Sequence, residues 1–105
     1  DPRPSEELAR RAWTVLATEQ ADPVLAVFLE LVGLGVSGVE PFDVLAPAVV
    51  SAWAEWLTPL VAAETPELAR DDALATMALL DGLLILRHTT GAEAAERVAR
   101  RLGVA

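Results

Sequence analysis

The stretch Asp71–Thr89, DDALATMALLDGLLILRHT, decides the fold of this chain. Its apolar residues recur at three- and four-residue intervals, the spacing of an α-helix, and on a helical wheel they cover two opposite faces. The first face carries Leu74, Met77, Leu80 and Leu84, and the second carries Ala75, Leu79, Leu83 and Leu86. A surface helix needs only one apolar stripe. We therefore expect this helix either to be fully buried in a monomer or to be covered on one face by a second chain.

The second of these arrangements is the one that the short chain favours, because a five-helix domain of 105 residues has little material to surround a long helix. We expect one face to pack on the chain's own core. The other face and the last helix would pair with a symmetry-related copy in a four-helix dimer interface. The interface residues predicted in this way are Ala75, Leu79, Gly82, Leu83, Leu86, Val98 and Leu102.

Capping signals on either side of this stretch predict four further helices. Ser5 is a candidate N-cap for a helix that ends near Glu19, and Asp22-Pro23 is a start signal for a second helix that extends to Val36. The first of these carries an apolar stripe of Leu8, Ala12, Val15 and Leu16. No segment shows the two-residue alternation of a β-strand.

The remaining boundaries are set by prolines, threonines and glycines. Pro41–Leu45 is expected to form an opening turn before a helix from Ala46 to about Ala63, with a kink at Pro59. Thr65-Pro66 then begins the long helix, which is expected to run to Thr89 and has a candidate restart at Asp71 or Asp72. Thr90 and Glu93 fit a capping box for the last helix, which Gly103 ends. The prediction is an all-α, five-helix bundle that forms one domain over residues 1–105.

Composition excludes several classes of function. The net charge of −8 disfavours direct nucleic-acid binding, which needs clustered cations. Cysteine is absent and His88 is the lone histidine, so we expect no disulfide, no metal site and no cofactor. Neither a signal peptide nor a membrane span is evident, and we expect a cytoplasmic protein without a membrane partner.

Aromatic and polar residues on several helices predict a cavity for a mostly apolar small molecule. Trp13, Phe28 and Trp53 lie on three helices that surround the long one, whose inner face also carries Asp81. The predicted ligand-binding residues are Trp13, Phe28, Trp53, Leu57, Met77, Asp81, Leu84 and His88. The alternative is that the aromatic side chains are ordinary core, and that Asp81 bonds His88 or an arginine. No nucleophile lies beside Asp81 and His88, so catalysis is not expected.

These residues, taken in order, resemble a known family. The resemblance rests on Trp13, Asp22-Pro23, Phe28-Leu29-Glu30, Trp53, Trp56-Leu57, the run Ala78–Leu84, and Thr90-Gly91. Over almost its whole length the chain resembles the C-terminal domain of the tetracycline-repressor (TetR) family of transcriptional regulators.

The resemblance implies a homodimer formed by the long helix and the last one, and a cavity for a small-molecule effector. It further implies that DNA is contacted only through an N-terminal helix-turn-helix domain, which nothing before Asp1 supplies. In the family, effector binding shifts two such domains and releases the operator. The alternative to this function is a purely structural helical dimerisation module without a ligand.

Overall fold

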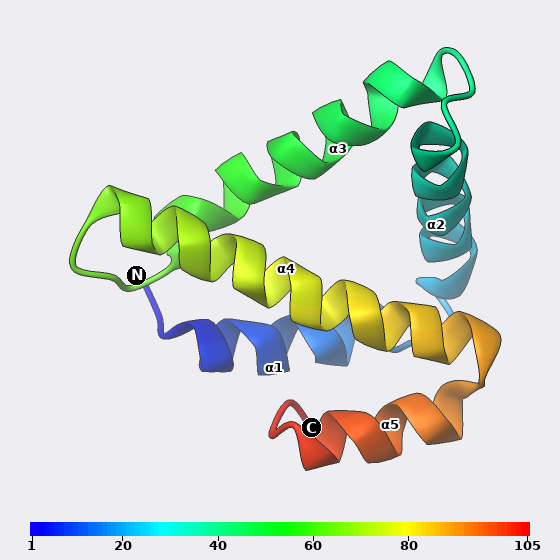
Figure 1. Ribbon diagram of the computed structural model, residues 1–105. Coiled ribbons are helices and arrows are strands. Elements are labelled where there is room, and N and C mark those ends of the chain that lie inside the picture. The colour runs from blue at the N-terminus through cyan, green and yellow to red at the C-terminus, as the bar shows by residue number, and fades with distance from the viewer.

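The computed structural model describes residues 1–105 and contains five α-helices and no β-strand (Figure 1). The helices are α1 (Ser5–Leu16), α2 (Asp22–Val36), α3 (Phe42–Leu57), α4 (Pro66–Thr89) and α5 (Ala92–Arg101), with a short 3-10 helix, η1 (Thr58–Leu60), after α3. The predicted all-α class and the number of helices are therefore confirmed.

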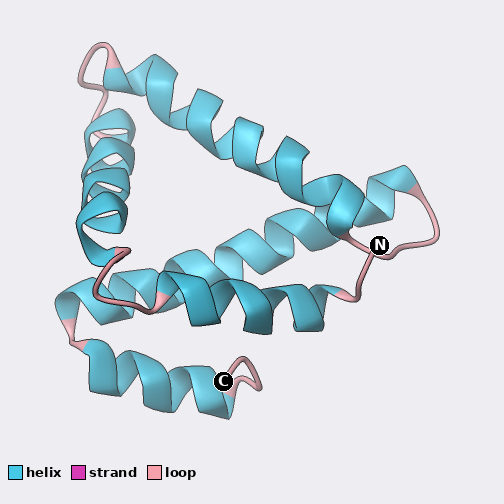
Figure 2. Ribbon diagram, turned by 180° about the vertical axis from the view of Figure 1, so that it is seen from behind, coloured by secondary structure: helices cyan, strands magenta, loops and turns pink.

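The helices are arranged around α4, the longest of them. Figures 1 and 2 show α2, α3 and α4 as the three sides of a triangle, and α1 and α5 on the side of α4 that faces away from it. The chain enters beside the turn between α3 and α4, where the backbone of Arg3 forms an isolated parallel bridge with Val61. The α4 helix is thus the element on which every other part of the fold is assembled.

The main core lies between α1, α4 and α5. It consists of Ala9, Trp13, Leu25, Leu80, Leu83, Leu84, Ala95, Ala99 and Val104. Small alanines on α5 allow that helix to pack closely, and Leu25 is the single contribution of α2. A second, smaller cluster of Val61, Ala69 and Ala73 closes the other end of α4.

The start of α4 and the end of α5 follow the sequence signals. The Thr65 hydroxyl oxygen accepts a hydrogen bond from the Leu68 N–H at 3.1 Å, as expected of an N-cap, and Pro66 follows as the first helical residue. The helix then continues without interruption through Asp71 and Asp72. At the other end of the chain, Gly103 adopts a φ of 76° and terminates α5, as predicted.

Three predicted caps are wrong. Ser5 is the first residue of α1, Pro4 occupies the N-cap position, and no side chain caps this helix. Asp22 is the first residue of α2 and makes no cap, because its carboxylate accepts two hydrogen bonds from Arg87 instead. No side chain caps α5, so the Thr90–Glu93 capping box does not form. The Thr90 N–H closes the last turn of α4 on the Leu86 carbonyl at 2.8 Å, and Gly91, with a φ of 117°, immediately precedes α5.

The first and third helices also differ from expectation at their ends. The α1 helix stops at Leu16, three residues before the expected Glu19. The α3 helix begins at Phe42 and runs through Pro47, so the separate opening turn at Pro41–Leu45 is wrong. Proline at position 47 removes only the hydrogen bond to the Asp43 carbonyl, which lies in the first turn. At Pro59 the chain tightens into η1 instead of continuing as a kinked α-helix.

The α2 and α3 helices lie in close contact at Gly35. A Cβ atom added there would lie 2.6 Å from the Ala46 Cβ and 2.7 Å from the Phe42 carbonyl oxygen, whereas one added at Gly33 would meet nothing within 4 Å. We expect Gly35→Ala to destabilise the protein by about 1–3 kcal/mol through overpacking. Gly33→Ala on the same helix should stabilise it by up to ~1 kcal/mol through helix propensity. Urea unfolding at one fixed protein concentration measures both, and equal shifts would contradict the close approach.

Much apolar surface stays uncovered in the single chain. Hydrophobic residues make up 53% of the sequence, yet only 17 of the 105 residues are buried. None of the helices combines the length and the apolar character needed to cross a bilayer. Exposed apolar residues line a cavity and form an outer strip of α4, and others lie along α2 and up to the start of α3: Val24, Val27, Val36, Val39, Val44 and Leu45.

Candidate ligand-binding site

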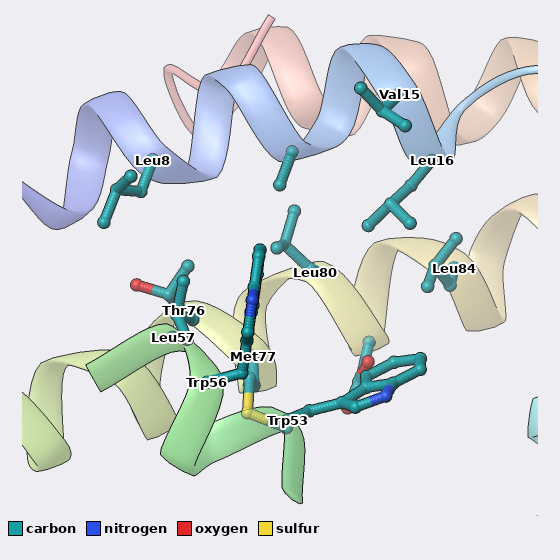
Figure 3. A pocket seen from close by; sticks show the side chains of 12 residues that line it. Leu8, Val15, Leu16, Trp53, Trp56, Leu57, Thr76, Met77, Leu80 and Leu84 are labelled. Carbon is teal, nitrogen blue, oxygen red and sulfur yellow. The ribbon is translucent and has the colours of Figure 1, made fainter. Parts of the chain in front are cut away.

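A cavity of about 640 Å³ lies between α1, α3 and α4 (Figure 3). Ten of its twelve lining residues are hydrophobic, and the two polar ones are Thr76 and Asp81. The lining comprises Leu8, Ala12, Val15, Leu16, Trp53, Trp56, Leu57, Thr76, Met77, Leu80, Asp81 and Leu84. Its volume falls within the roughly 300–1,000 Å³ of pockets that enclose drug-sized ligands.

Helical periodicity accounts for the lining. The residues from α1 and α4 recur at three- and four-residue spacing, so each helix presents one continuous stripe to the cavity. The α3 helix contributes Trp53, Trp56 and Leu57 from its last two turns. Figure 3 shows these side chains pointing from the three helices into one space.

The cavity is open on the side between α1 and α3. Val15 on α1 is 67% exposed and Trp56 on α3 is 70% exposed, although both line it. Met77, Leu80 and Leu84 on α4 are buried and form its closed side. A ligand can therefore enter past Val15 and Trp56 and rest on α4.

Trp53 is held in place from behind by Phe28. The two rings are stacked with their centroids 4.7 Å apart and an angle of 18° between their planes. Phe28 is buried and does not line the cavity itself. Its role at the site is to orient Trp53, and the stack is also the main aromatic contact between α2 and α3.

Asp81 is the one charged residue in the lining. Its carboxylate takes part in none of the side-chain hydrogen bonds or ion pairs of the chain, and burial without compensation raises its pKa. The other polar residue, Thr76, donates its hydroxyl proton to the Asp72 carbonyl at 2.8 Å, within its own helix. The cavity therefore presents one unpartnered polar group in an apolar wall.

Five of the eight predicted ligand-binding residues line the cavity: Trp53, Leu57, Met77, Asp81 and Leu84. Trp13, Phe28 and His88 do not. Trp13 points to the other side of α1, where its Nε1–H donates to the Glu96 Oε2 at 3.1 Å. The α1 wall was not predicted, although Leu8, Ala12, Val15 and Leu16 form an apolar stripe in the sequence. Trp56, Thr76 and Leu80 line the cavity as well and were not predicted to do so.

His88 belongs to a different cluster, at the junction of α2 and α4. Arg87 donates from Nε and Nη2 to the two carboxylate oxygens of Asp22 at 2.8 and 3.0 Å. His88 Nε2 lies 3.6 Å from Asp22 Oδ1 and has no hydrogen-bond partner. The hydrogen bonds from Arg87 are the main reason why the pKa of Asp22 is lowered. This cluster ties the first turn of α2 to the last turn of α4, and Asp81 does not pair with His88.

The outer face of α4 is apolar and uncovered. Between Leu74 and Leu86, every exposed residue of α4 is apolar: Leu74, Ala75, Ala78, Gly82 and Ile85, here named the α4 strip. Leu79 and Leu86 are half-buried beside it, and Val98 and Leu102 on α5 are exposed. Leu74, Ala78 and Ile85 were not among the predicted interface residues, and Leu74, which was expected on the inner face, is 39% exposed.

Leu83 is the predicted interface residue that the structure places elsewhere. It is 2% exposed and belongs to the core between α1, α4 and α5. Because it is buried in this core, it has no free surface to offer to a second subunit.

The structure contains no group of three or more histidine or acidic side chains placed to hold a metal ion. Comparisons with protein families, with well-characterised proteins and with solved structures found no match to this chain. The site must therefore be interpreted from its own geometry and chemistry.

Proposed function

We propose that this chain is the effector-binding and homodimerisation domain of a cytoplasmic, TetR-like transcriptional regulator. The observation that carries the proposal is the open, mostly apolar cavity of about 640 Å³ between α1, α3 and α4. An empty cavity of this kind exposes its apolar lining to water, and its aromatic walls with a single polar group suit a mostly apolar ligand. The site contains no activated nucleophile, which favours binding over catalysis.

The α4 strip supports the homodimer. A continuous apolar surface along one helix, extended by Val98 and Leu102 of α5, is a surface that water disfavours and that a second copy would cover. The small residues Ala75, Ala78 and Gly82 are exposed there and would let two α4 helices approach closely. Two α4–α5 pairs would then form a four-helix interface about a two-fold axis.

The entry of the chain offers a route by which ligand binding could act on an N-terminal DNA-binding domain. The Arg3 N–H donates to the Leu60 carbonyl at 2.9 Å, and the Ala62 N–H donates to the Arg3 carbonyl at 2.8 Å. These bonds tie the first residues to η1, which directly follows the cavity residue Leu57. A shift of Leu57 on ligand binding would therefore move the segment that enters from the N-terminal side.

Binding of a neutral apolar fluorophore, N-phenyl-1-naphthylamine, tests the proposal. We expect fluorescence titration to show saturable binding that Ala12→Phe weakens by at least about tenfold, or 1.4 kcal/mol, because the added ring fills the cavity. Ala48→Phe, on an exposed position of α3 outside the lining, is the matched control and should bind as the wild type does.

Two results would overturn the proposed function. No saturable binding by a chain that still dimerises would assign it to the class of purely structural dimerisation modules. Equal binding by the wild type and the Ala12→Phe variant would show that the fluorophore binds elsewhere on the surface, and the cavity would lose its assigned role. Circular dichroism of each variant verifies that it remains folded.

A further inference from the structure

The cavity lining contains a single ionisable group, and its charge restricts the class of ligand that can bind. Asp81 is the only ionisable residue among the twelve that line the cavity, and neither α1 nor α3 contributes a charged group to the lining. Other carboxylates near the core have donors: Asp22 has Arg87, Glu7 has Arg3 and Arg11, and Glu96 has the indole of Trp13. The carboxylate of Asp81 is thus left without a counterion in a lining whose other residues are, apart from Thr76, all hydrophobic.

An unpartnered carboxylate in such a wall is unfavourable for folding, and burial accordingly raises the pKa of Asp81. An alanine or leucine at this position would stabilise the empty protein better. Groups of this kind are concentrated at functional sites, where a ligand supplies the missing partner. A positively charged nitrogen or phosphorus centre is the partner that a carboxylate takes, whereas an anionic ligand would be repelled.

The two tryptophans of the cavity point to the same kind of ligand. Indole rings attract cations through their π faces more strongly than other aromatic side chains do. Trp53 and Trp56 both line the cavity, and the stack on Phe28 fixes the orientation of the Trp53 ring. A cation between these rings and Asp81 would be neutralised by the carboxylate and held by the indoles, while its apolar body contacts Met77 and Leu80.

We propose that the ligand of this cavity is a lipophilic cation, with Asp81 as its counterion and Trp53 and Trp56 as its aromatic walls. The proposal rests on the proposed function and narrows it to one class of effector. It excludes fatty acids and other amphipathic anions as effectors.

Two ions of nearly equal shape and opposite charge provide the test: tetraphenylphosphonium and tetraphenylborate. We expect isothermal titration calorimetry to show that the full chain binds the phosphonium at least tenfold more tightly than the borate. Asp81→Asn keeps the shape of the side chain and removes its charge. This variant should weaken phosphonium binding about tenfold and strengthen borate binding, so that the preference is lost.

A second test introduces a counterion for Asp81 from the protein itself, with a matched control variant elsewhere. Val15→Arg places a cation at the mouth of the cavity and should weaken phosphonium binding about tenfold. Val24→Arg, on α2 outside the lining, changes the net charge equally at a similarly exposed position and should leave phosphonium binding unchanged.

The pH dependence of binding is a further test of the role of Asp81. Because the phosphonium has no titratable proton, its affinity should fall as the pH is lowered through the pKa of Asp81. The Asp81→Asn variant should lose this dependence.

The outcomes separate this inference from the proposed function. If N-phenyl-1-naphthylamine occupies the cavity but the two ions bind equally, or the borate binds more tightly, the ligand class is wrong and the binding function stands. Unchanged phosphonium affinity in both Asp81→Asn and Val15→Arg would overturn the role of Asp81. If neither the fluorophore nor either ion binds the wild type, the proposed function fails and the inference fails with it.

Discussion

The Trp13→Ala variant is expected to lose about 3–5 kcal/mol of its free energy of unfolding, the cost typical of truncating a buried tryptophan. Trp13 is 2% exposed and lies in the core that joins α1 to α4 and α5. Its removal would leave a void and would deprive Glu96 of the indole donor at 3.1 Å. A domain of this size has about 5–15 kcal/mol of stability in all, so the loss is a large fraction. Urea unfolding followed by circular dichroism, at one protein concentration, measures it.

Trp13→Phe separates the structural role of this residue from a role in ligand binding. Phenylalanine keeps most of the aromatic packing and removes the hydrogen bond to Glu96, so we expect a smaller loss of about 1–2 kcal/mol. Because Trp13 does not line the cavity, the affinity for N-phenyl-1-naphthylamine should equal that of the wild type. An affinity reduced as in Ala12→Phe would instead support the expectation from the sequence that Trp13 is a wall of the ligand site.

The position of Trp13 shows what helical periodicity can predict and where it stops. Ala9 and Trp13 lie four residues apart and face the core, whereas Leu8 and Ala12, one residue earlier in each case, line the cavity. Periodicity predicts which residues share a face, because the rotation of 100° per residue is a property of the backbone. Which neighbouring helix covers each face depends on the tertiary packing, and no pattern within α1 specifies it.

The same distinction explains the results on α4. Of the predicted inner face, Met77, Leu80 and Leu84 line the cavity, whereas Leu74 lies on the exposed strip. Of the predicted outer face, only Ala75 is exposed, and Leu79 and Leu86 are half-buried against the core. Leu83 was assigned to the outer face, but it is buried in the core that α4 shares with α1 and α5, where the small side chains of Ala95 and Ala99 let α5 approach. Asp22 failed as a cap for a related reason, since its carboxylate accepts hydrogen bonds from Arg87 on another helix.

A substitution in the centre of the α4 strip should have the largest effect on assembly. We expect the wild-type chain to be a dimer at micromolar concentration and Ala78→Arg to be a monomer, with the dissociation constant raised at least about 100-fold, or ~2.7 kcal/mol. Ala78 is exposed in the single chain, so the arginine causes no clash within it. In an interface with two-fold symmetry, each substitution occurs twice and places two like charges in an apolar contact.

Sedimentation velocity measures this change, with Ala52→Arg, on an exposed position of α3, as the control that alters the charge equally. Gly82→Ala sharpens the test, because a Cβ atom there meets nothing within 4 Å in the single chain. The added methyl group should therefore stabilise the monomer by up to ~1 kcal/mol through helix propensity. It should also hinder the approach of two α4 helices and so weaken dimerisation. Stronger dimerisation of Gly82→Ala, or an unaltered dimer in Ala78→Arg, would place the interface away from the α4 strip. A monomeric wild type would instead leave the strip uncovered, so that dimerisation could not be the role of this surface.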